Sequence, residues 1–135
     1  MPRFRLTSTP PLEASEQAAL FQWATAMSRQ ESRLRWLFAI PNGTAAISPA
    51  EAVKAKRTGR KKGVPDVFLP VPSRGYHGLF IELKRLNGQL SDLSDEQALW
   101  IQALTEQGYK TAVCFGWIDA AQTIKSYLRI GEDQT

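Results

Sequence analysis

Two short apolar runs that end in charged residues place the strongest constraint on the fold of this chain. They lie within GVPDVFLPVPSRGYHGLFIELKR, residues 63–85, and predict two β-strands, Asp66 to Val71 and Gly78 to Lys84. The Pro, Ser and Gly-rich PSRGYHG between them is typical of a hairpin loop longer than the tight two-residue turns. We therefore expect the two strands to pair in the antiparallel direction.

The charged residues of the second run share one face of the strand, because side chains alternate between the two faces. In GLFIELK, Phe80, Glu82 and Lys84 point to that face, and the leucines and the isoleucine point to the opposite face. In an antiparallel pair the start of one strand lies beside the end of the other. Asp66, which opens the first strand, is therefore expected to approach Glu82 and Lys84.

Two carboxylates and one ammonium group at the end of a sheet need a physical explanation. Burying such a charge without a partner is costly, and two close carboxylates repel each other unless a cation or a proton lies between them. Mg²⁺ suits this arrangement, because one or two carboxylates and a substrate phosphate commonly hold it. The alternative is an ordinary ion pair of Lys84 with Glu82 or Asp66 at the rim of the sheet.

The N-terminal half shows the periodicity of helices and contains one undecided segment. A first helix is predicted over residues 11–27, and a short helix runs from the capping box of Ser48 and Glu51 to about Thr58. Between them, residues 34–43, LRWLFAIPNG, fit either a helix or a strand and end at the turn signal Pro-Asn-Gly.

The first helix contains an acid in an unexpected place. At about 100° per residue, Glu16 falls in the middle of the apolar stripe, whereas Glu13 lies at its edge. A core position is unfavourable for a carboxylate that has no partner. The alternative is that the carboxylate of Glu16 reaches solvent between its neighbours.

The C-terminal half predicts a helix that starts at the capping box of Ser94 and Gln97, a strand in YKTAVCFGW, and a last helix capped by Asp119. From Asp66 onward the order is therefore strand, strand, helix, strand, helix. The central strand-helix-strand unit predicts a right-handed parallel crossover. The expected fold class is α/β, with a mixed β-sheet flanked by helices.

A basic segment precedes the first of the two charged strands. Six of the nine residues from 54 to 62 are basic, namely Lys54, Lys56, Arg57, Arg60, Lys61 and Lys62. Such a run suits contacts with the phosphate backbone of a nucleic acid, which give affinity with little sequence information. A solvated charge run without a partner is the alternative.

The composition limits the class of protein. The chain has 135 residues, 43% of them hydrophobic, and a net charge of +4, so we expect one domain over residues 1–135. With Cys114 as the only cysteine and His77 as the only histidine, an intrachain disulfide and a Cys/His zinc site are excluded. The absence of a long apolar run and of a signal-peptide pattern leads us to expect a soluble, cytosolic protein.

Pro65-Asp66, followed after 15 residues by Glu82-Leu83-Lys84, resembles the motif of the PD-(D/E)xK nuclease superfamily. The fuller string GVPDVFL, HGLFIELKR, LSDEQ, GY and AVCFGW is similar to its VRR-NUC branch, the virus-type replication-repair nucleases. The resemblance extends from about Glu16 to Leu128. It implies a restriction-endonuclease-like core and a metal-dependent DNA endonuclease of replication and repair that cuts branched DNA, such as a Holliday junction or a flap.

The resemblance also implies roles for the charged residues. Asp66 and Glu82 would bind Mg²⁺ or Mn²⁺, with the backbone carbonyl of Leu83 as a further ligand. Lys84 would orient or activate the attacking water. Metal-bound water is more acidic than free water, and a fixed positive charge stabilises the developing negative charge.

For two further roles, the resemblance leaves two candidate residues each. The acid that the family carries on its first helix maps onto Glu16, with Glu13 as the rival. The glutamine that follows the charged strand in the family maps onto Gln97, with Gln89 as the second candidate.

The expected partner is DNA, held by the basic segment and by Arg85, and a membrane is not expected. By resemblance to single-domain relatives, we expect a homodimer whose two sites make two symmetric cuts. The competing hypothesis is a DNA-binding module that has the same fold but no catalytic activity. An intact set of Asp66, Glu82 and Lys84 argues against that hypothesis.

Overall fold

The structure is a computed structural model that describes residues 13–41 and 48–132. Its helices are α1 (Glu13–Met27), α2 (Pro49–Arg57), α3 (Asp95–Glu106) and α4 (Trp117–Leu128), with short 3-10 helices η2 (Ser32–Trp36) and η3 (Leu90–Asp92). Its strands are β1 (Phe38–Ala39), β2 (Val67–Leu69), β3 (Leu79–Lys84) and β4 (Lys110–Phe115).

The described strands form one mixed sheet in the order β1-β2-β3-β4. Strands β1 and β2 are antiparallel, as are β2 and β3, whereas β4 is parallel to β3. The predicted hairpin is confirmed by a register that pairs Val67 with Ile81 and Leu69 with Leu79. The predicted parallel crossover is also confirmed, because α3 connects β3 to β4.

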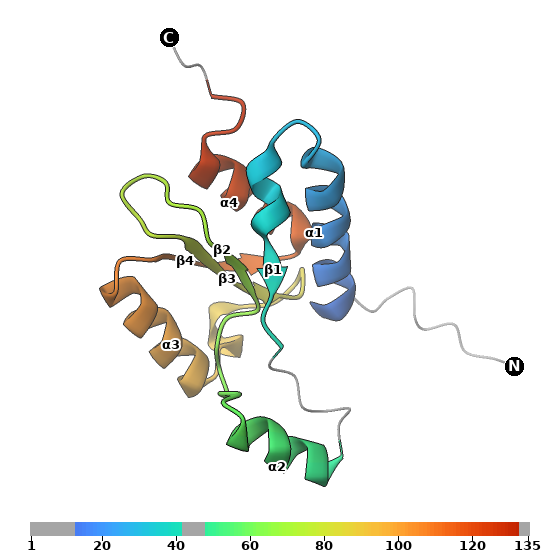
Figure 1. Ribbon diagram of the computed structural model, residues 1–135, viewed down its shortest axis with the longest axis vertical. Coiled ribbons are helices and arrows are strands. Elements are labelled where there is room, and N and C mark those ends of the chain that lie inside the picture. Colours follow the sequence, from blue (N-terminus) through green and yellow to red (C-terminus); the bar gives the residue numbers. More distant parts are fainter. Residues whose placement is uncertain (1–12, 42–47, 133–135) are drawn as a thin grey trace, which may run out of the picture.

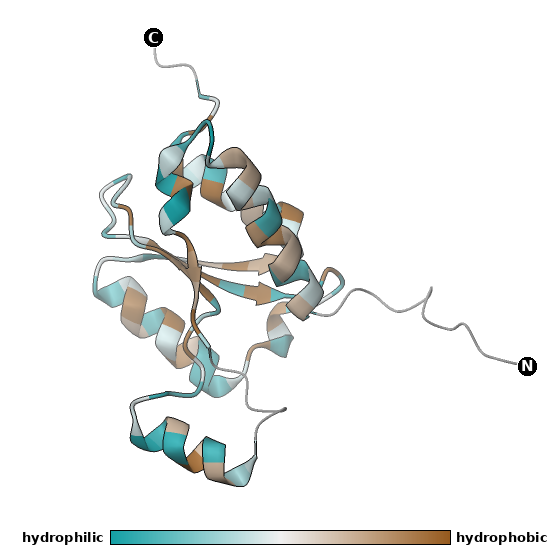
Figure 2. Ribbon diagram, turned by 45° about the vertical axis from the view of Figure 1, so that its right-hand side comes forward, coloured by the Kyte–Doolittle hydropathy of each residue, from teal (hydrophilic) through white to brown (hydrophobic). Residues whose placement is uncertain are grey.

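The two faces of the sheet have different neighbours (Figure 1). Helices α1 and α4 pack together against one face, where Leu20, Ile81 and Ile124 belong to the same buried core. Helix α3 packs against β4 on the other face, toward which Glu82 and Lys84 point. Hydropathy follows this arrangement, because the strands are mainly apolar and α2, away from the sheet, is mainly polar (Figure 2).

The segment that fitted either a helix or a strand contains both structures. Residues 32–36 form the 3-10 helix η2, and Phe38 then pairs with Phe68 as part of the edge strand β1. A sequence of this length cannot distinguish the two states, because the partner that selects the strand lies about thirty residues further along the chain. Asn42 and Gly43 of the turn signal lie outside the described residues.

The predicted helix starts are confirmed in two cases and wrong in a third. Ser48 caps α2, and Ser94 and Gln97 form the expected capping box of α3. The last helix, however, begins at Trp117 with Gly116 as its N-cap, so Asp119 is not the cap. Asp119 instead lies in the first turn and accepts a hydrogen bond of 2.9 Å from the Phe115 N–H.

Candidate active site

Asp66 lies where the sequence predicted, at the point where β2 begins and β3 ends. The Leu83 N–H donates a hydrogen bond of 2.7 Å to Oδ2 of Asp66. The backbone of Asp66 is held by β1, because its carbonyl oxygen accepts a hydrogen bond of 2.8 Å from the Ile40 N–H. Both bonds fix the Asp66 carboxylate beside the end of β3.

Glu82 and Lys84 are buried on the sheet face that α3 covers. Their side chains are 1% and 7% exposed, and Nζ of Lys84 lies 3.7 Å from Oε2 of Glu82. The ion pair that the sequence offered as an alternative explanation is therefore present, although it is buried. Removing one member of a buried pair leaves an uncompensated charge, so neither residue behaves as a surface charge.

The Glu82 carboxyl group is in an electrostatically unfavourable position. Burial and the negative charge of Asp66 raise the pKa of Glu82 to about 8, against the opposing effect of Lys84. Its Oε1 is buried and has no hydrogen-bond partner among the described residues. A buried polar atom without a partner is rare in a folded protein and marks a position where a proton or a cation would be favourable.

Gln97 connects the start of α3 to both of these charged residues. Its Nε2 donates a hydrogen bond of 3.0 Å to Oε2 of Glu82, and its Oε1 accepts one of 3.1 Å from Nζ of Lys84. The same Oε1 accepts a hydrogen bond of 2.9 Å from the Ser94 N–H. One side chain therefore both completes the capping box of α3 and contacts the charged strand.

Gln89, the second candidate for this position, lies at the start of η3. Its side chain is exposed, and its N–H donates to Oδ2 of Asp92. Among the described residues, Gln97 is thus the glutamine that contacts Glu82 and Lys84.

The two acids of α1 have different surroundings. Glu16 is 7% exposed, and its Oε1 accepts a hydrogen bond of 2.7 Å from the Trp117 N–H at the start of α4. Gly116, the N-cap of α4, has a positive φ of 88°, and a Cβ there would lie 3.3 Å from that carboxylate oxygen. Glu16 therefore satisfies the N–H of the first residue of α4, one of the N–H groups that have no partner within the helix.

Glu13 borders the charged end of the sheet at Asp66. It lines a hollow of about 460 Å³ together with Asp66 and with Ile40, which follows β1. Its negative charge contributes to the raised pKa of Glu82. The rival of Glu16 is thus the α1 acid that borders Asp66.

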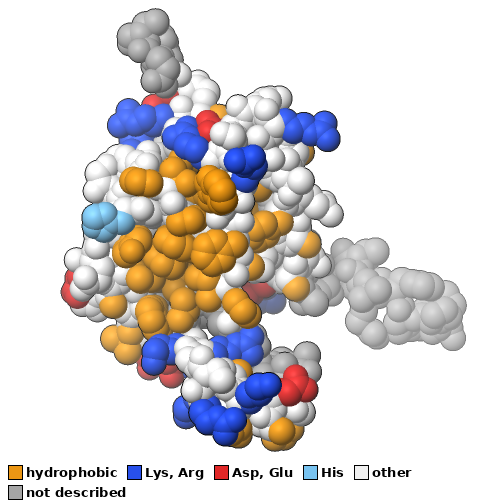
Figure 3. Space-filling model, viewed as in Figure 1, with side chains coloured by type: hydrophobic (Ala, Val, Ile, Leu, Met, Phe, Trp, Pro, Cys, Tyr) orange, Lys and Arg blue, Asp and Glu red, His pale blue; other side chains and the backbone are white. Residues whose placement is uncertain are grey.

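The basic segment lies next to the site but mostly outside the folded body. The side chains of Lys54, Lys56 and Arg57 are exposed on α2, which extends away from the sheet (Figures 1 and 3). Arg60 is anchored, because its Nε donates a hydrogen bond of 3.0 Å to the Pro41 carbonyl oxygen.

Lys61 and Lys62 follow Arg60 and are exposed, and Lys62 lies 3.9 Å from Glu96 at the start of α3. The chain passes close to α3 at Gly63, whose φ is +92° and where a Cβ would lie 2.6 Å from that of Glu96. Glycine is therefore required for this approach. Arg85, also exposed, directly follows the buried Lys84.

Sequence reasoning missed the aromatic side chains beside the charged strand. Trp36 and Phe38 are 56% and 48% exposed, on the segment whose secondary structure was undecided. The signal in the sequence was the alternation in RWLFA, in which buried Leu37 separates two exposed aromatic residues.

Two features are absent from the described part of the chain, namely a cluster of metal-binding side chains and a helix that could span a membrane. Among residues 13–41 and 48–132, no group of three or more His, Cys, Asp or Glu side chains could hold a metal ion. Within the same residues, none of the helices has the length and apolar character needed to cross a membrane.

Comparison with known proteins identifies the family of the chain. The sequence pattern of the VRR-NUC domain matches residues 9–117. A solved structure described as a VRR_NUC domain protein superimposes with a TM-score of 0.74 at 26% identity, covering 91% of this chain and 93% of that chain. No curated protein matches the chain. The mixed sheet flanked by helices is thus a restriction-endonuclease-like α/β fold, and the chain belongs to the VRR-NUC family, a family of nucleases.

Proposed function

We propose that the chain is a metal-dependent DNA endonuclease that hydrolyses phosphodiester bonds. The observation that carries the proposal is the Glu82 carboxyl group, which is buried beside Asp66 and has an oxygen without a hydrogen-bond partner among the described residues. Two carboxylates in this position are unfavourable for a folded protein and favourable for a cation.

The residues present fit one Mg²⁺ or Mn²⁺ ion bound to Asp66 and Glu82, with the Leu83 carbonyl as a further candidate ligand. The two carboxylates alone do not form a complete protein site, and the described residues contain no group of three or more His, Cys, Asp or Glu side chains that could hold a metal ion. Mg²⁺ commonly keeps waters and takes substrate phosphate oxygens at its remaining positions. When bound, such an ion lowers the pKa of water and neutralises charge that develops on the phosphoryl group.

Lys84 has the role of holding a positive charge near the attacking water. Its ammonium group is fixed by Glu82 on one side and by Gln97 on the other, so it needs little reorganisation when negative charge develops. Its backbone carbonyl accepts a hydrogen bond of 2.9 Å from the Gly116 N–H, which holds the strand end in place. Gln97 acts as a positioning residue, because it contacts Glu82 and Lys84 at the same time.

The acid on α1 completes the proposed site. The family resemblance implies Glu16 for this position, with Glu13 as the rival. Because the Glu16 carboxylate is bound to the Trp117 N–H and Glu13 borders Asp66, we expect Glu13 to be this acid. The basic residues of α2, the Arg60–Lys62 segment and Arg85 would contact the DNA backbone. Such contacts are sequence-independent, so the metal site and the shape of the DNA would determine where the strand is cut.

The proposed substrate is branched DNA, such as a Holliday junction or a flap, and the proposed active form is a homodimer. A dimer would present two copies of the site and so make two cuts on a symmetric junction. Sedimentation of the full chain alone and with a junction measures the stoichiometry. A monomer on every substrate would contradict this part of the proposal and leave the nuclease assignment untouched.

The deciding experiment incubates the full chain with labelled junction, flap, nicked and single-stranded DNA, with Mg²⁺, with Mn²⁺ and with EDTA. We expect cleavage only with the metals, and none by Asp66→Asn. Asp95→Asn, which makes the same chemical change at an exposed position on α3, is the matched control and should remain active. Full activity in EDTA or in Asp66→Asn would refute the site, whereas DNA binding without cleavage would support the DNA-binding module.

A further inference from the structure

A row of aromatic rings crosses the sheet on the face that carries Glu82. The register pairs Phe38 with Phe68 and Phe68 with Phe80. Phe68 and Phe80 are stacked with ring centroids 4.0 Å apart, and Phe38 contacts Phe68 edge-on at 5.7 Å. Such geometries are favourable for aromatic pairs, so each ring in the row supports its neighbour.

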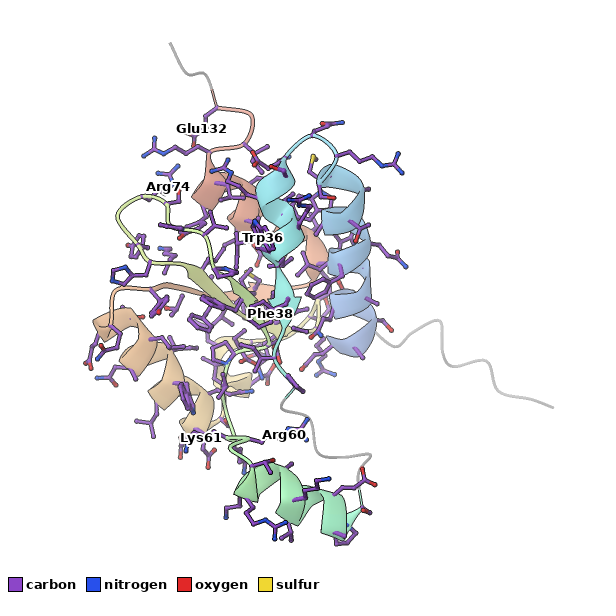
Figure 4. All side chains as sticks on the ribbon, in the orientation of Figure 1. Trp36, Phe38, Arg60, Lys61, Arg74 and Glu132 are labelled. Atoms are coloured by element: carbon purple, nitrogen blue, oxygen red, sulfur yellow. The ribbon has the colours of Figure 1, made fainter. Side chains whose placement is uncertain are left out.

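The outer end of the row is open. Phe38 is 48% exposed and Trp36, two residues earlier, is 56% exposed, whereas Leu37 between them is buried. Figure 4 shows both side chains along the η2–β1 segment. In the same orientation, Figure 3 shows a broad patch of hydrophobic side chains on the surface. Large exposed apolar patches mark binding surfaces rather than ordinary protein surface.

The inner end of the row, at Phe80, is close to the proposed metal site. Phe80 precedes Glu82 by two residues on the same face of β3, which corresponds to about 7 Å along the strand. The segment after Phe38 also leads into the hollow that Ala39 and Ile40 line together with Asp66.

Cations border the aromatic patch. The Arg35 guanidinium group lies 5.4 Å from the centre of the Trp36 ring. Below the patch, Arg60 and Lys61 lie between the sheet and α2 (Figure 4). Exposed aromatic rings between cations match a nucleic-acid strand, in which flat bases alternate with phosphates. A second copy of the chain on this face would bring the same cations toward one another.

We propose that Trp36 and Phe38 form a stacking platform for unpaired bases of the DNA strand next to the cut. The proposal rests on the nuclease function proposed above and adds the part of the substrate that this face recognises. Bases in an intact duplex are stacked on each other and do not present their faces to the platform. The platform therefore favours DNA whose bases are unpaired near the cut, as at a branch point or a flap.

The test measures binding of the full chain in EDTA, at one fixed salt concentration, to a fluorescent oligothymidylate and to a blunt duplex of the same length. The variants are Trp36→Ala, Phe38→Ala and the double variant. Trp36→Phe keeps an aromatic ring, and Leu99→Ala truncates an apolar side chain on α3 that is 65% exposed, as the matched control. Thermal melting verifies that each variant is folded.

We expect each alanine variant to bind the oligothymidylate about tenfold more weakly, because base–aromatic stacking contributes that much or more per base. Duplex affinity should change by less than about twofold. Trp36→Phe and Leu99→Ala should remain close to the unmodified protein. An oligonucleotide that contains 2-aminopurine should lose fluorescence on binding the unmodified protein and keep it with the double variant.

Unchanged single-strand affinity in the folded double variant, with duplex binding and cleavage intact, would overturn the platform and leave the proposed function in place. A dimer that dissociates in the double variant without any change in single-strand affinity would assign the face to a second copy and overturn it as well. Failure to bind or cut any DNA in the unmodified protein would instead refute the proposed function.

Discussion

Oε1 of Glu16 accepts a hydrogen bond of 2.7 Å from the backbone N–H of Trp117, which joins the first helix to the last one. The two residues are 101 positions apart in the chain. The bond explains how a carboxylate is tolerated in the apolar stripe of α1, because the carboxylate accepts from an N–H at the start of α4 that has no partner within that helix. It also distinguishes a structural role, which Glu16 has through this bond, from the catalytic role of the acid on α1, which Glu16 or Glu13 could have.

Glutamine and alanine substitutions distinguish these roles. Glu16→Gln keeps an oxygen that accepts from Trp117, so we expect a small change in both melting temperature and activity. Glu16→Ala leaves a partly buried N–H without its partner and should lower the free energy of unfolding by about 1–3 kcal/mol. Glu13→Gln should lower the cleavage rate without loss of stability, because Glu13 lines the hollow beside Asp66.

Chemical denaturation and single-turnover cleavage of a labelled junction measure these effects. If Glu16→Gln abolished cleavage at an unchanged melting temperature, Glu16 would be the catalytic acid that the family resemblance implies.

Gln97→Ala should reduce the cleavage rate by about 10- to 100-fold, the range found for residues that orient metal ligands. The variant removes the hydrogen bonds to Glu82 and Lys84 and, in addition, half of the capping box. Ser94→Ala removes the other half of the box and leaves the Gln97 amide in place. Rates measured at saturating DNA separate an effect on chemistry from an effect on binding.

A loss of stability alone would produce similar rates in folded Gln97→Ala and Ser94→Ala. Gln102→Ala, an exposed glutamine on the same helix, serves as the neutral control. We expect the positioning role to be visible as slow cleavage in the Gln97 variant only.

The raised pKa of Glu82 predicts how stability depends on pH without metal. The pKa is about 8 in the folded protein and has its ordinary value of 4.5 when the chain unfolds. Between pH 4.5 and about pH 8 the folded state binds one proton more than the unfolded state does. The stabilisation of the fold by this proton is therefore complete below pH 4.5 and is lost as the pH rises through about 8. For one proton, the free energy of unfolding falls by up to about 1.4 kcal/mol per pH unit.

Urea denaturation in EDTA from about pH 5 to about pH 9 measures this slope. Glu82→Gln should show a smaller loss of stability over the same range, because its side chain does not titrate. Addition of Mg²⁺ or Mn²⁺ should stabilise the unmodified protein at the upper end of the range and have little effect on Glu82→Gln. Identical pH profiles for the two proteins would contradict the buried, protonated carboxyl group.

The basic segment next to the site should bind backbone phosphates. Replacing Arg60, Lys61 and Lys62 together with Ala should weaken binding to every DNA to a similar extent. The log–log slope of affinity against salt should decrease by about 0.9 for each phosphate of duplex DNA that the variant no longer neutralises. The position of the cut should stay the same, because the strands and not this segment hold the proposed metal ligands.

Fluorescence anisotropy at several salt concentrations, together with mapping of the cut, measures both effects. Normal affinity with an unchanged slope would show that the segment is a solvated charge run, and the phosphates would then have to be bound by Arg85 or by another surface.

The sequence was sufficient wherever a short-range pattern reflects a local physical cause. Alternation in GLFIELK predicted which face of β3 carries Glu82 and Lys84, because a strand turns each successive side chain to the other face. The hairpin then brought Asp66 to the end of β3. The capping boxes predicted where α2 and α3 begin, since a side chain and a backbone N–H three residues apart satisfy each other.

Only the tertiary structure decided which residues at a distance are partners. Residues 34–43 contain both a 3-10 helix and a strand, because pairing with Phe68 selects the extended conformation of Phe38. The last helix starts two residues before Asp119, because Glu16 from α1 supplies the hydrogen bond to Trp117. Gln97 caps its own helix and also contacts Glu82 and Lys84, because the crossover places α3 over the end of β3. Hydrogen bonds and burial depend on distance in space, and separation along the chain does not reveal that distance.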